Sequence, residues 1–233
     1  TVNEAWSSCT EGVSGISKVD VGIPNSPVSV GAQLKNFHTS DYLNLKEVRR
    51  IDPFIQYGLI AANQSIADSG ILDFVSLNKE KVGINFGAGI GGIQTIENNK
   101  MILESKGYKK VSPFFVPGSI VNMISGLVSI KHGFMGPNTS VVTACSTGNH
   151  CIGTAARSIA CGEADVMIAG GAEMASTPLS ISGFISARAL STNPDPESAC
   201  RPWDKDRDGF ILADGAGSLV LEDYEHAKER NAH

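Results

Sequence analysis

The sequence predicts an α/β protein built on a largely buried sheet. Short runs rich in β-branched and apolar residues recur along the chain, at about 28–32, 82–86, 140–144, 165–169 and 217–222. Segments with the apolar spacing of helices lie between these runs. Two of the runs, those ending at Phe86 and Ala169, lead into glycine-rich turns. Alternation of this kind is typical of a sheet whose faces are covered by helices.

Composition sets limits on what the protein does. The chain has 233 residues, 42% of them hydrophobic, which is enough for a sizeable core. Its net charge of −5 and the lack of any long basic block disfavour nucleic-acid binding. No apolar run approaches the roughly 18 residues that a membrane span needs. Five cysteines, an odd number, argue against a disulfide framework. We therefore expect a soluble protein of a reducing, cytoplasmic compartment, with no membrane insertion and no polynucleotide partner.

The first element expected is a short helix within residues 1–15. Thr1 and Glu4 have the spacing of a capping box at its start, and Trp6 and Val13 are expected to contact the core. A loop follows, with the strand at 28–32 inside it.

The remaining helices follow from local start and stop signals. Pro53 suits the first turn of a helix whose apolar face continues to Gly70, a natural stop. A second helix should run from the glycine turn at 87–92 to about Leu103, and the stretch 112–130 should pass from an extended piece into an apolar helix. Small residues within 147–161 predict a buried helix that packs closely against its neighbours.

The glycine turn at 87–92 supports a competing interpretation. Gly87, Gly89 and Gly92 fit the G-x-G-x-x-G pattern between a strand and a helix, which is the context of a dinucleotide site. That pattern requires a second parallel strand ending in an acidic residue about twenty positions further on. The sequence has a polar, proline-punctuated segment there instead, so nicotinamide binding is disfavoured.

Cys145 is the candidate nucleophile. The run Ser140–Thr143 leads into Cys145, and helical spacing follows at once, which predicts a strand, a sharp turn and a helix. A cysteine at such a joint lies near the free N–H groups and the positive dipole end of the helix, which favour thiolate over thiol. The alternative is an inert core cysteine, since free cysteine is among the most buried residue types.

Other candidate sites have simpler explanations. Cys145, His150 and Cys151 lack the spacing of zinc ligands, and His150 is better explained as a packed or hydrogen-bonded structural histidine than as a catalytic base. Glu173, just beyond a buried strand, is expected to support a loop by hydrogen bonding, with a direct catalytic role less favoured.

The segment 204–209, DKDRDG, matches the head of an EF-hand loop, but its twelfth position is Gly215 where calcium needs a glutamate. We expect an ion-paired loop near the entrance of the active site and no metal.

Five ordered motifs together resemble a known family. They are TACSTG at 143–148, SPFFVPGSIVNMISG at 112–126, ADVMIAGGAEMASTPL at 164–179, ARALST at 187–192 and RPWDKDRDGFILADGAGSLVLED at 201–223. They resemble the first half of a β-ketoacyl-[acyl-carrier-protein] synthase of the elongating, synthase II-like type, in the thiolase-like superfamily. The implied fold is layered α/β/α/β/α, and residues 1–233 would form the N-terminal domain, the first of two similar halves. Because family members begin with a strand and continue into a second half, we expect this sequence to be part of a longer polypeptide.

The resemblance implies a reaction and its residues. Cys145 would accept an acyl chain from acyl carrier protein, with its backbone N–H in the oxyanion hole, and the acyl-enzyme would condense with malonyl carrier protein after decarboxylation. Ile90, Phe115 and Phe184 would line the acyl pocket, with Phe115 reaching the pocket of the partner in a homodimer. The exposed basic residues Lys46, Arg49 and Arg50 would dock the acidic carrier protein or else form only a solvated face.

The resemblance leaves several points open. The two histidines that assist decarboxylation in the family would lie beyond residue 233, and no metal, flavin or nicotinamide cofactor is implied. A polyketide-type ketosynthase would share Cys145, and a thiolase would use coenzyme A thioesters without decarboxylation. A non-enzymatic subunit of the same fold would lack the cysteine. Chain-length preference does not follow from the sequence.

Overall fold

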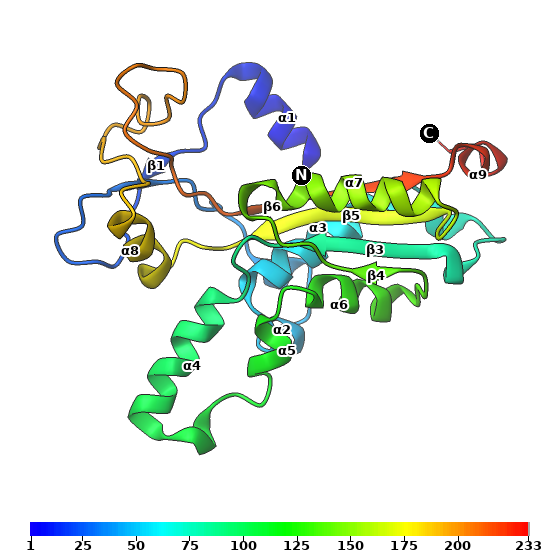
Figure 1. Cartoon of the computed structure of the whole chain (residues 1–233), viewed down its shortest axis with the longest axis horizontal. Helices are drawn as coiled ribbons and strands as arrows, with labels where there is room; N and C mark the ends of the chain where they lie inside the picture. The colour runs from blue at the N-terminus through cyan, green and yellow to red at the C-terminus, as the bar shows by residue number, and fades with distance from the viewer. Residues whose placement is uncertain (233) are drawn as a thin grey trace. The chain divides into compact units, whose positions relative to one another are not determined.

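A four-stranded mixed sheet forms the centre of the larger of two compact units in the chain. The structure is a computed structural model that describes residues 1–232 (Figure 1). The larger unit contains residues 36–174 and the chain from Gly215 onward. The smaller unit contains residues 1–35 and 175–214.

The sheet has the strand order β4-β3-β5-β6. β4 (Asn138–Thr139), β3 (Val82–Gly87) and β5 (Val166–Glu173) are parallel, and β6 (Gly215–Glu222) is antiparallel to β5. Every residue of β3 is buried, as expected for a strand between two covered faces. The strands predicted at 82–86, 165–169 and 217–222 are thus confirmed.

The strand predicted at 140–144 is wrong. The strand pairs at Asn138 and Thr139 only, and the chain then leaves the ladder. Ser140 Oγ donates to the carbonyl of Phe86 at 2.7 Å, and the backbone N–H of Thr143 donates to Thr147 Oγ1 at 2.9 Å. Side-chain hydrogen bonds have replaced the regular pairing that the β-branched residues suggested.

Alternate residues of β5 face opposite layers of the larger unit. Val166 and Ile168 belong to the main core with residues of α3 (Pro53–Asp68) and α6 (Met123–His132). Met167 and Ala169 pack against α7 (Thr147–Ala160) on the other face. Figure 1 shows the strands of the sheet between these helices. The layered α/β architecture predicted for the chain is present in this unit.

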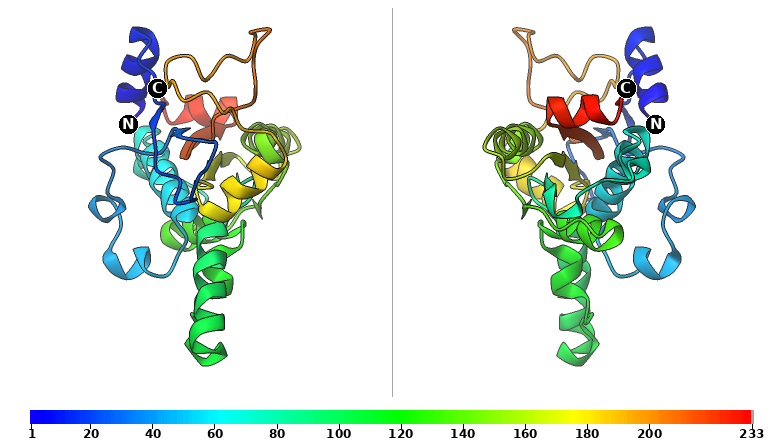
Figure 2. Two further views of the ribbon diagram at one scale, coloured as in Figure 1. Left: turned by 90° about the vertical axis from the view of Figure 1, so that its left-hand side faces the viewer. Right: turned by 90° about the vertical axis from the view of Figure 1, so that its right-hand side faces the viewer.

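The helices begin where local signals predicted. The side chain of Asp52 caps α3 by accepting from the N–H of Phe54 at 3.2 Å, and Pro53 occupies its first turn. α4 (Ile93–Lys106) follows the glycine turn and projects away from the sheet (Figure 2). The predicted helix within 112–130 is divided into α5 (Phe115–Ser119) and α6. α2 (Leu45–Val48) and α9 (Tyr224–Glu229) are short, and single 3-10 turns lie at Thr39–Asp41, Ile71–Asp73, Lys79–Lys81, Tyr108–Lys110 and Ala144–Ser146.

Helix α7 is buried on one face only, whereas a buried helix was predicted. Thr147, Cys151 and Ala155 are its buried residues. Asn149 and Gly153 are exposed on the far side. The small residues of α7 therefore permit close approach to the sheet but do not place the whole helix in the core.

The smaller unit contains α1 (Val2–Glu11), α8 (Pro178–Ser186) and a two-residue pairing of β1 (Ser17–Lys18) with β2 (Val30–Gly31). The predicted capping box between Thr1 and Glu4 is present. Trp6 and Val13, expected in the core, are 70% and 59% exposed, so that prediction is wrong. None of the residues of α1 is buried, because the core of this unit gathers around Val21, Val28, Ile181 and Leu190. Within residues 1–232, every helix is too short or too polar to cross a bilayer.

Candidate active site

Cys145 occupies the middle of a tight turn at the start of α7. The turn, Ala144–Ser146, is a single 3-10 turn, and Ala144 adopts the left-handed backbone conformation with φ 51°. Ser146 closes the turn with its N–H at 3.2 Å and its Oγ at 2.8 Å from the carbonyl of Thr143. Cys145 is exposed, so it is not an inert core cysteine. The buried cysteine among the described residues is Cys151, six residues further on, where burial raises the pKa of the thiol.

Threonine and histidine side chains hold this turn in place. Thr147 Oγ1 accepts from the N–H of Thr143 and donates to the carbonyl of Ala144 at 2.8 Å. His150 Nδ1 lies 2.7 Å from Thr143 Oγ1. The prediction that His150 is hydrogen-bonded is confirmed, and its structural role stays a prediction. Sequence reasoning missed Thr143 and Thr147, because nothing in their spacing indicates a bond back across the turn.

The electrostatics of the turn favour negative charge. Cys145 comes two residues before α7, a helix of 14 residues. No side chain caps the first turn of this helix. Free N–H groups and the dipole at the start of a helix can stabilise the oxyanion of a thioester under attack.

The glycine turn lies beside the cysteine, at the same edge of the sheet. β3 and β5 are parallel, so their carboxyl ends bring together Gly87–Gly92 and Glu173. Glu173 accepts from the N–H of Ile90 at 2.8 Å and from that of Gly91 at 3.0 Å. The prediction that Glu173 supports a loop is confirmed. Because its carboxylate takes the N–H groups that a bound pyrophosphate would need, the turn is unsuited to a dinucleotide.

The predicted pocket residues belong to different units. Ile90 lies on the glycine turn and is 41% exposed, and Phe115 is half-buried as the first residue of α5. Both are in the larger unit with Cys145. Phe184 is in the smaller unit on α8, where its ring packs edge-to-face on Phe210 with centroids 5.2 Å apart.

The predicted basic cluster lies around α2. Lys46, Arg49 and Arg50 are all exposed. The Arg50 guanidinium lies 4.7 Å from the ring centroid of Phe114, a cation–π contact that orients this side chain. Arg50 also borders a groove of about 550 Å³ whose other walls come mainly from α6 and from residues in and next to α2.

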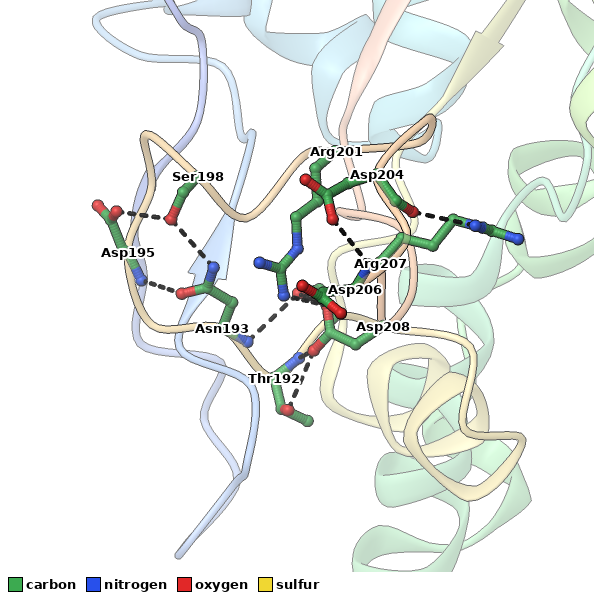
Figure 3. Close-up of polar contacts among 10 residues, drawn as sticks. Thr192, Asn193, Asp195, Ser198, Arg201, Asp204, Asp206, Arg207 and Asp208 are labelled. Atoms are coloured by element: carbon green, nitrogen blue, oxygen red, sulfur yellow. Dashed lines mark hydrogen bonds and ion pairs between the residues drawn. The ribbon is translucent and has the colours of Figure 1, made fainter.

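The aspartate-rich loop 204–209 differs from its prediction in detail. Figure 3 shows that Asp208 is the acceptor at its centre, bonded to Thr192 N at 2.9 Å and paired with Arg201 at 3.7 Å. A hydrogen bond from Ser191 and those from Thr192 hold the pKa of Asp208 below its ordinary value. Arg207 donates to the backbone carbonyl of Asp204, so neighbouring acidic and basic side chains do not neutralise one another as expected. In the part of the chain described, no group of three or more His, Cys, Asp or Glu residues is placed to hold a metal.

One further buried residue, which contacts the helix after the glycine turn, was not predicted from the sequence. Asp52 is buried, and its second carboxylate oxygen accepts from the N–H of Thr95 at 2.8 Å. Its bond to Phe54 could have been anticipated from an aspartate before Pro53, which is a helix-start signal. Its bond to the first turn of α4, 43 residues away, could not.

Solved ketosynthases of the thiolase-like fold are similar in structure to this chain and define its class. A β-ketoacyl synthase from Burkholderia phymatum STM815 matches 100% of the chain with a TM-score of 0.88 and 28% identity, over 58% of its own length. A type II polyketide ketosynthase, solved with its acyl carrier protein and a bound hexaketide, matches 86% of the chain with a TM-score of 0.71 and 30% identity, over 55% of its length.

The chain belongs to the β-ketoacyl synthase family. The model of the β-ketoacyl synthase N-terminal domain matches residues 1–227. The 3-oxoacyl-[acyl-carrier-protein] synthase 2 of Vibrio cholerae is 51% identical over 100% of the chain, and that of Coxiella burnetii is 50% identical over 99%. The chain spans 56% of the length of each, so it corresponds to about half of these relatives. The predicted family, fold and N-terminal half are confirmed.

Proposed function

We propose that this chain carries the acyl-accepting cysteine of a 3-oxoacyl-[acyl-carrier-protein] synthase that elongates fatty acids. The observation that carries the proposal is the exposed Cys145 on a braced turn at the N-terminus of α7. The names of relatives that are about half identical to this chain support the reaction class.

The geometry suggests how the first step proceeds. The Cys145 thiolate attacks the carbonyl carbon of an acyl thioester on the carrier, and a C–S bond forms as the carrier's C–S bond breaks. The oxyanion formed on the way is stabilised by the N–H of Cys145 and by the dipole of α7. The carrier sulfur leaves as a thiolate and takes a proton from solvent. A polarisable sulfur suits this exchange because it is both a good nucleophile and a good leaving group.

The second step forms the carbon–carbon bond. Malonyl carrier protein loses carbon dioxide, and the resulting carbanion attacks the acyl carbon on Cys145. The product is a β-ketoacyl chain two carbons longer, and the Cys145 thiolate is released for the next cycle. Ile90, Phe115 and Phe184 are proposed to line the acyl pocket, as the family resemblance implies.

The proposed partners are acyl carrier protein and a second copy of the chain. Lys46, Arg49 and Arg50 are exposed, as docking of an acidic partner requires. A polyketide ketosynthase similar to this chain has been solved in complex with its carrier protein. Exposed apolar side chains on α5 and α6, such as Val116 and Ile130, suit a homodimer contact. Five unpaired cysteines fit a cytoplasmic location.

Mass spectrometry of the acylated protein tests the first step. The protein is incubated with octanoyl carrier protein, digested and sequenced. One octanoyl group is expected on Cys145, none in Cys145→Ala, and full loading in Cys161→Ala, which removes another exposed cysteine of the same unit. Loading of another cysteine, or of Cys145→Ala, would contradict the proposal.

A further measurement separates the proposed activity from that of a thiolase. If condensation proceeds with acetyl coenzyme A in the absence of any malonyl donor, the protein is a thiolase. Strict dependence on malonyl carrier protein, with carbon dioxide released in equal amount to product, supports the synthase.

A further inference from the structure

Glu173 connects two parts of the site that are far apart in the sequence. It is the last residue of β5, and the residues to which it bonds precede it by 82 and 83 positions. β5 pairs with β3 on one side and with β6 on the other, so Glu173 extends from a central strand of the sheet. A side chain held in this way can position a loop more accurately than a contact made by another loop.

The two hydrogen bonds use both oxygens of the carboxylate. Oε2 accepts from Ile90 and Oε1 from Gly91, which are successive N–H groups of one turn. Gly91 has φ 87°, a conformation that favours glycine and turns these N–H groups toward the carboxylate. Hydrogen bonds to an ionised acceptor are stronger than neutral ones. The carboxylate therefore fixes the backbone from which the side chain of Ile90 extends.

The surroundings of Gly89 show that the Glu173 carboxylate, the glycine turn and the turn that contains Cys145 are closely packed. A Cβ at Gly89 would lie 2.8 Å from Glu173 Oε2 and 3.4 Å from the carbonyl oxygen of Ala144. An added side chain would therefore displace the Glu173 carboxylate from its present position. A displacement of the glycine turn would therefore also change the packing against Ala144, the residue before Cys145.

We propose that Glu173 is a positioning residue that fixes the glycine turn 87–92 and so determines which acyl chain lengths are accepted beside Ile90. The inference rests on the proposed function, in which Ile90 lines the acyl pocket. A carboxylate is required because both N–H groups need an acceptor. Glutamine offers one oxygen and turns its NH₂ toward the other N–H, which loosens the turn without changing side-chain size.

The test compares Glu173→Gln with Glu163→Gln in the protein. Glu163 is an exposed glutamate of the same unit, beyond the far end of α7, and serves as the matched control. Transfer to Cys145 is measured with butyryl, octanoyl and palmitoyl carrier proteins. Glu173→Gln is expected to change the ratio of kcat/KM between the longest and shortest chain by about tenfold, mainly through KM, whereas Glu163→Gln leaves it unchanged.

Two further measurements distinguish positioning from other roles. The rate at which iodoacetamide alkylates Cys145, followed against pH, should be the same in Glu173→Gln and the parent protein. Ile90→Ala should change the same ratio of kcat/KM between the longest and shortest chains. The variant that combines both substitutions should show a ratio close to that of either single variant, because both substitutions alter the same wall of the acyl pocket.

The outcomes separate the inference from the proposed function. If Glu173→Gln lowers kcat/KM equally for all acyl chain lengths and also lowers the melting temperature, Glu173 has only a structural role and the inference is overturned. A shifted pH profile of alkylation would make it a catalytic group and also overturn it. Failure of the parent protein to load any acyl chain would instead overturn the proposed function.

Discussion

Gly87, at the end of β3, packs closely against the segments on either side of the cysteine turn. A Cβ there would overlap the carbonyl of Val141 and Cγ2 of Thr147 and would lie 3.1 Å from the sulfur of Cys151. Backbone atoms can move little in such a place, so the whole turn would have to shift. The absence of one side chain therefore allows α7 to start directly above the strand.

Gly87→Ala is expected to destabilise the protein by about 2–3 kcal/mol, the usual cost of overpacking. Gly153→Ala is the matched control, since it lies on the exposed face of α7 with no atom within 4 Å of an added Cβ. In a helix interior that change should stabilise the protein by about 0.5–1 kcal/mol. Urea unfolding measures both. Equal unfolding midpoints for the two variants would show that the contacts at Gly87 are not tight.

Sequence reasoning succeeded where one residue carries a local signal. Local spacing predicted a turn at Cys145 followed by a helix, and both are present. The role of Cys145 as a nucleophile came from the family resemblance and stays a prediction. The partners of Glu173 were not predicted, because hydrogen bonds across more than eighty residues leave no mark in local spacing. The exposure of Trp6 was not predicted either. Apolar character alone does not identify which side of a short helix is covered by the rest of the protein.

At the scale of elements, Asp52 joins the starts of two helices. One oxygen caps α3 through Phe54, and the other accepts from Thr95 in the first turn of α4. Negative charge near two helix N-termini is favourable, although burial raises the pKa of Asp52 above its ordinary value and the hydrogen bonds from Thr95 and Phe54 only partly offset this. The direction in which α4 leaves the glycine turn therefore depends on this carboxylate.

Asp52→Ala is expected to lower the free energy of unfolding by about 2–4 kcal/mol, because it leaves two N–H groups without their acceptor. Asp52→Asn keeps one acceptor and should lose about half as much. Asp68→Asn, at the exposed end of α3, is the control and should have little effect. Hydrogen exchange of the Thr95 amide reports the bond directly. Unchanged protection of that amide in Asp52→Ala would contradict the assignment.

At 140–144, element prediction failed because tertiary contacts compete with local preference. The helix at 53–68 has a cap, a proline in its first turn and a continuous apolar face, and the sequence predicted it within two residues. The β-branched run at 140–144 had equally clear strand preference. It was not a strand, since Ser140 and Thr143 bond to Phe86 and Thr147 instead. Pattern alone cannot reveal such partners.

At the scale of the whole molecule, the chain passes between its two units at three points, and Asp214 lies at the last of them. Within the smaller unit, Asp214 Oδ1 accepts from the N–H groups of Ala175 and Ser176 at 2.9 and 3.2 Å. Its own N–H donates to the carbonyl of Ala32. Asp214 thus joins three segments of this unit. Its bonds to Ala175 and Ser176 hold together the two ends of the segment 175–214.

The stability that these hydrogen bonds give the smaller unit depends on pH, because of the environment of the Asp214 carboxyl group. Burial raises its pKa above the ordinary 3.8, and the hydrogen bonds from Ser176 and Ala175 only partly offset this. The folded state then holds the proton more tightly than the unfolded state. The stability contributed by Asp214 is therefore greatest below about pH 3.8 and falls as the pH rises through the raised folded value.

Two variants of Asp214 separate the acceptor from the charge. Asp214→Asn retains one oxygen that can accept from both N–H groups and removes the buried charge, so at pH 7 the segment 175–214 should be as protected from hydrogen exchange as in the parent protein, or more so. Asp214→Ala removes the acceptor, and exchange at Ala175 and Ser176 should rise about tenfold or more. The parent protein should lose protection between pH 4 and pH 7 relative to Asp214→Asn. An equal rise in hydrogen exchange in both variants would mean that the negative charge of Asp214, and not its hydrogen-bond acceptor, holds the ends of the segment 175–214 together.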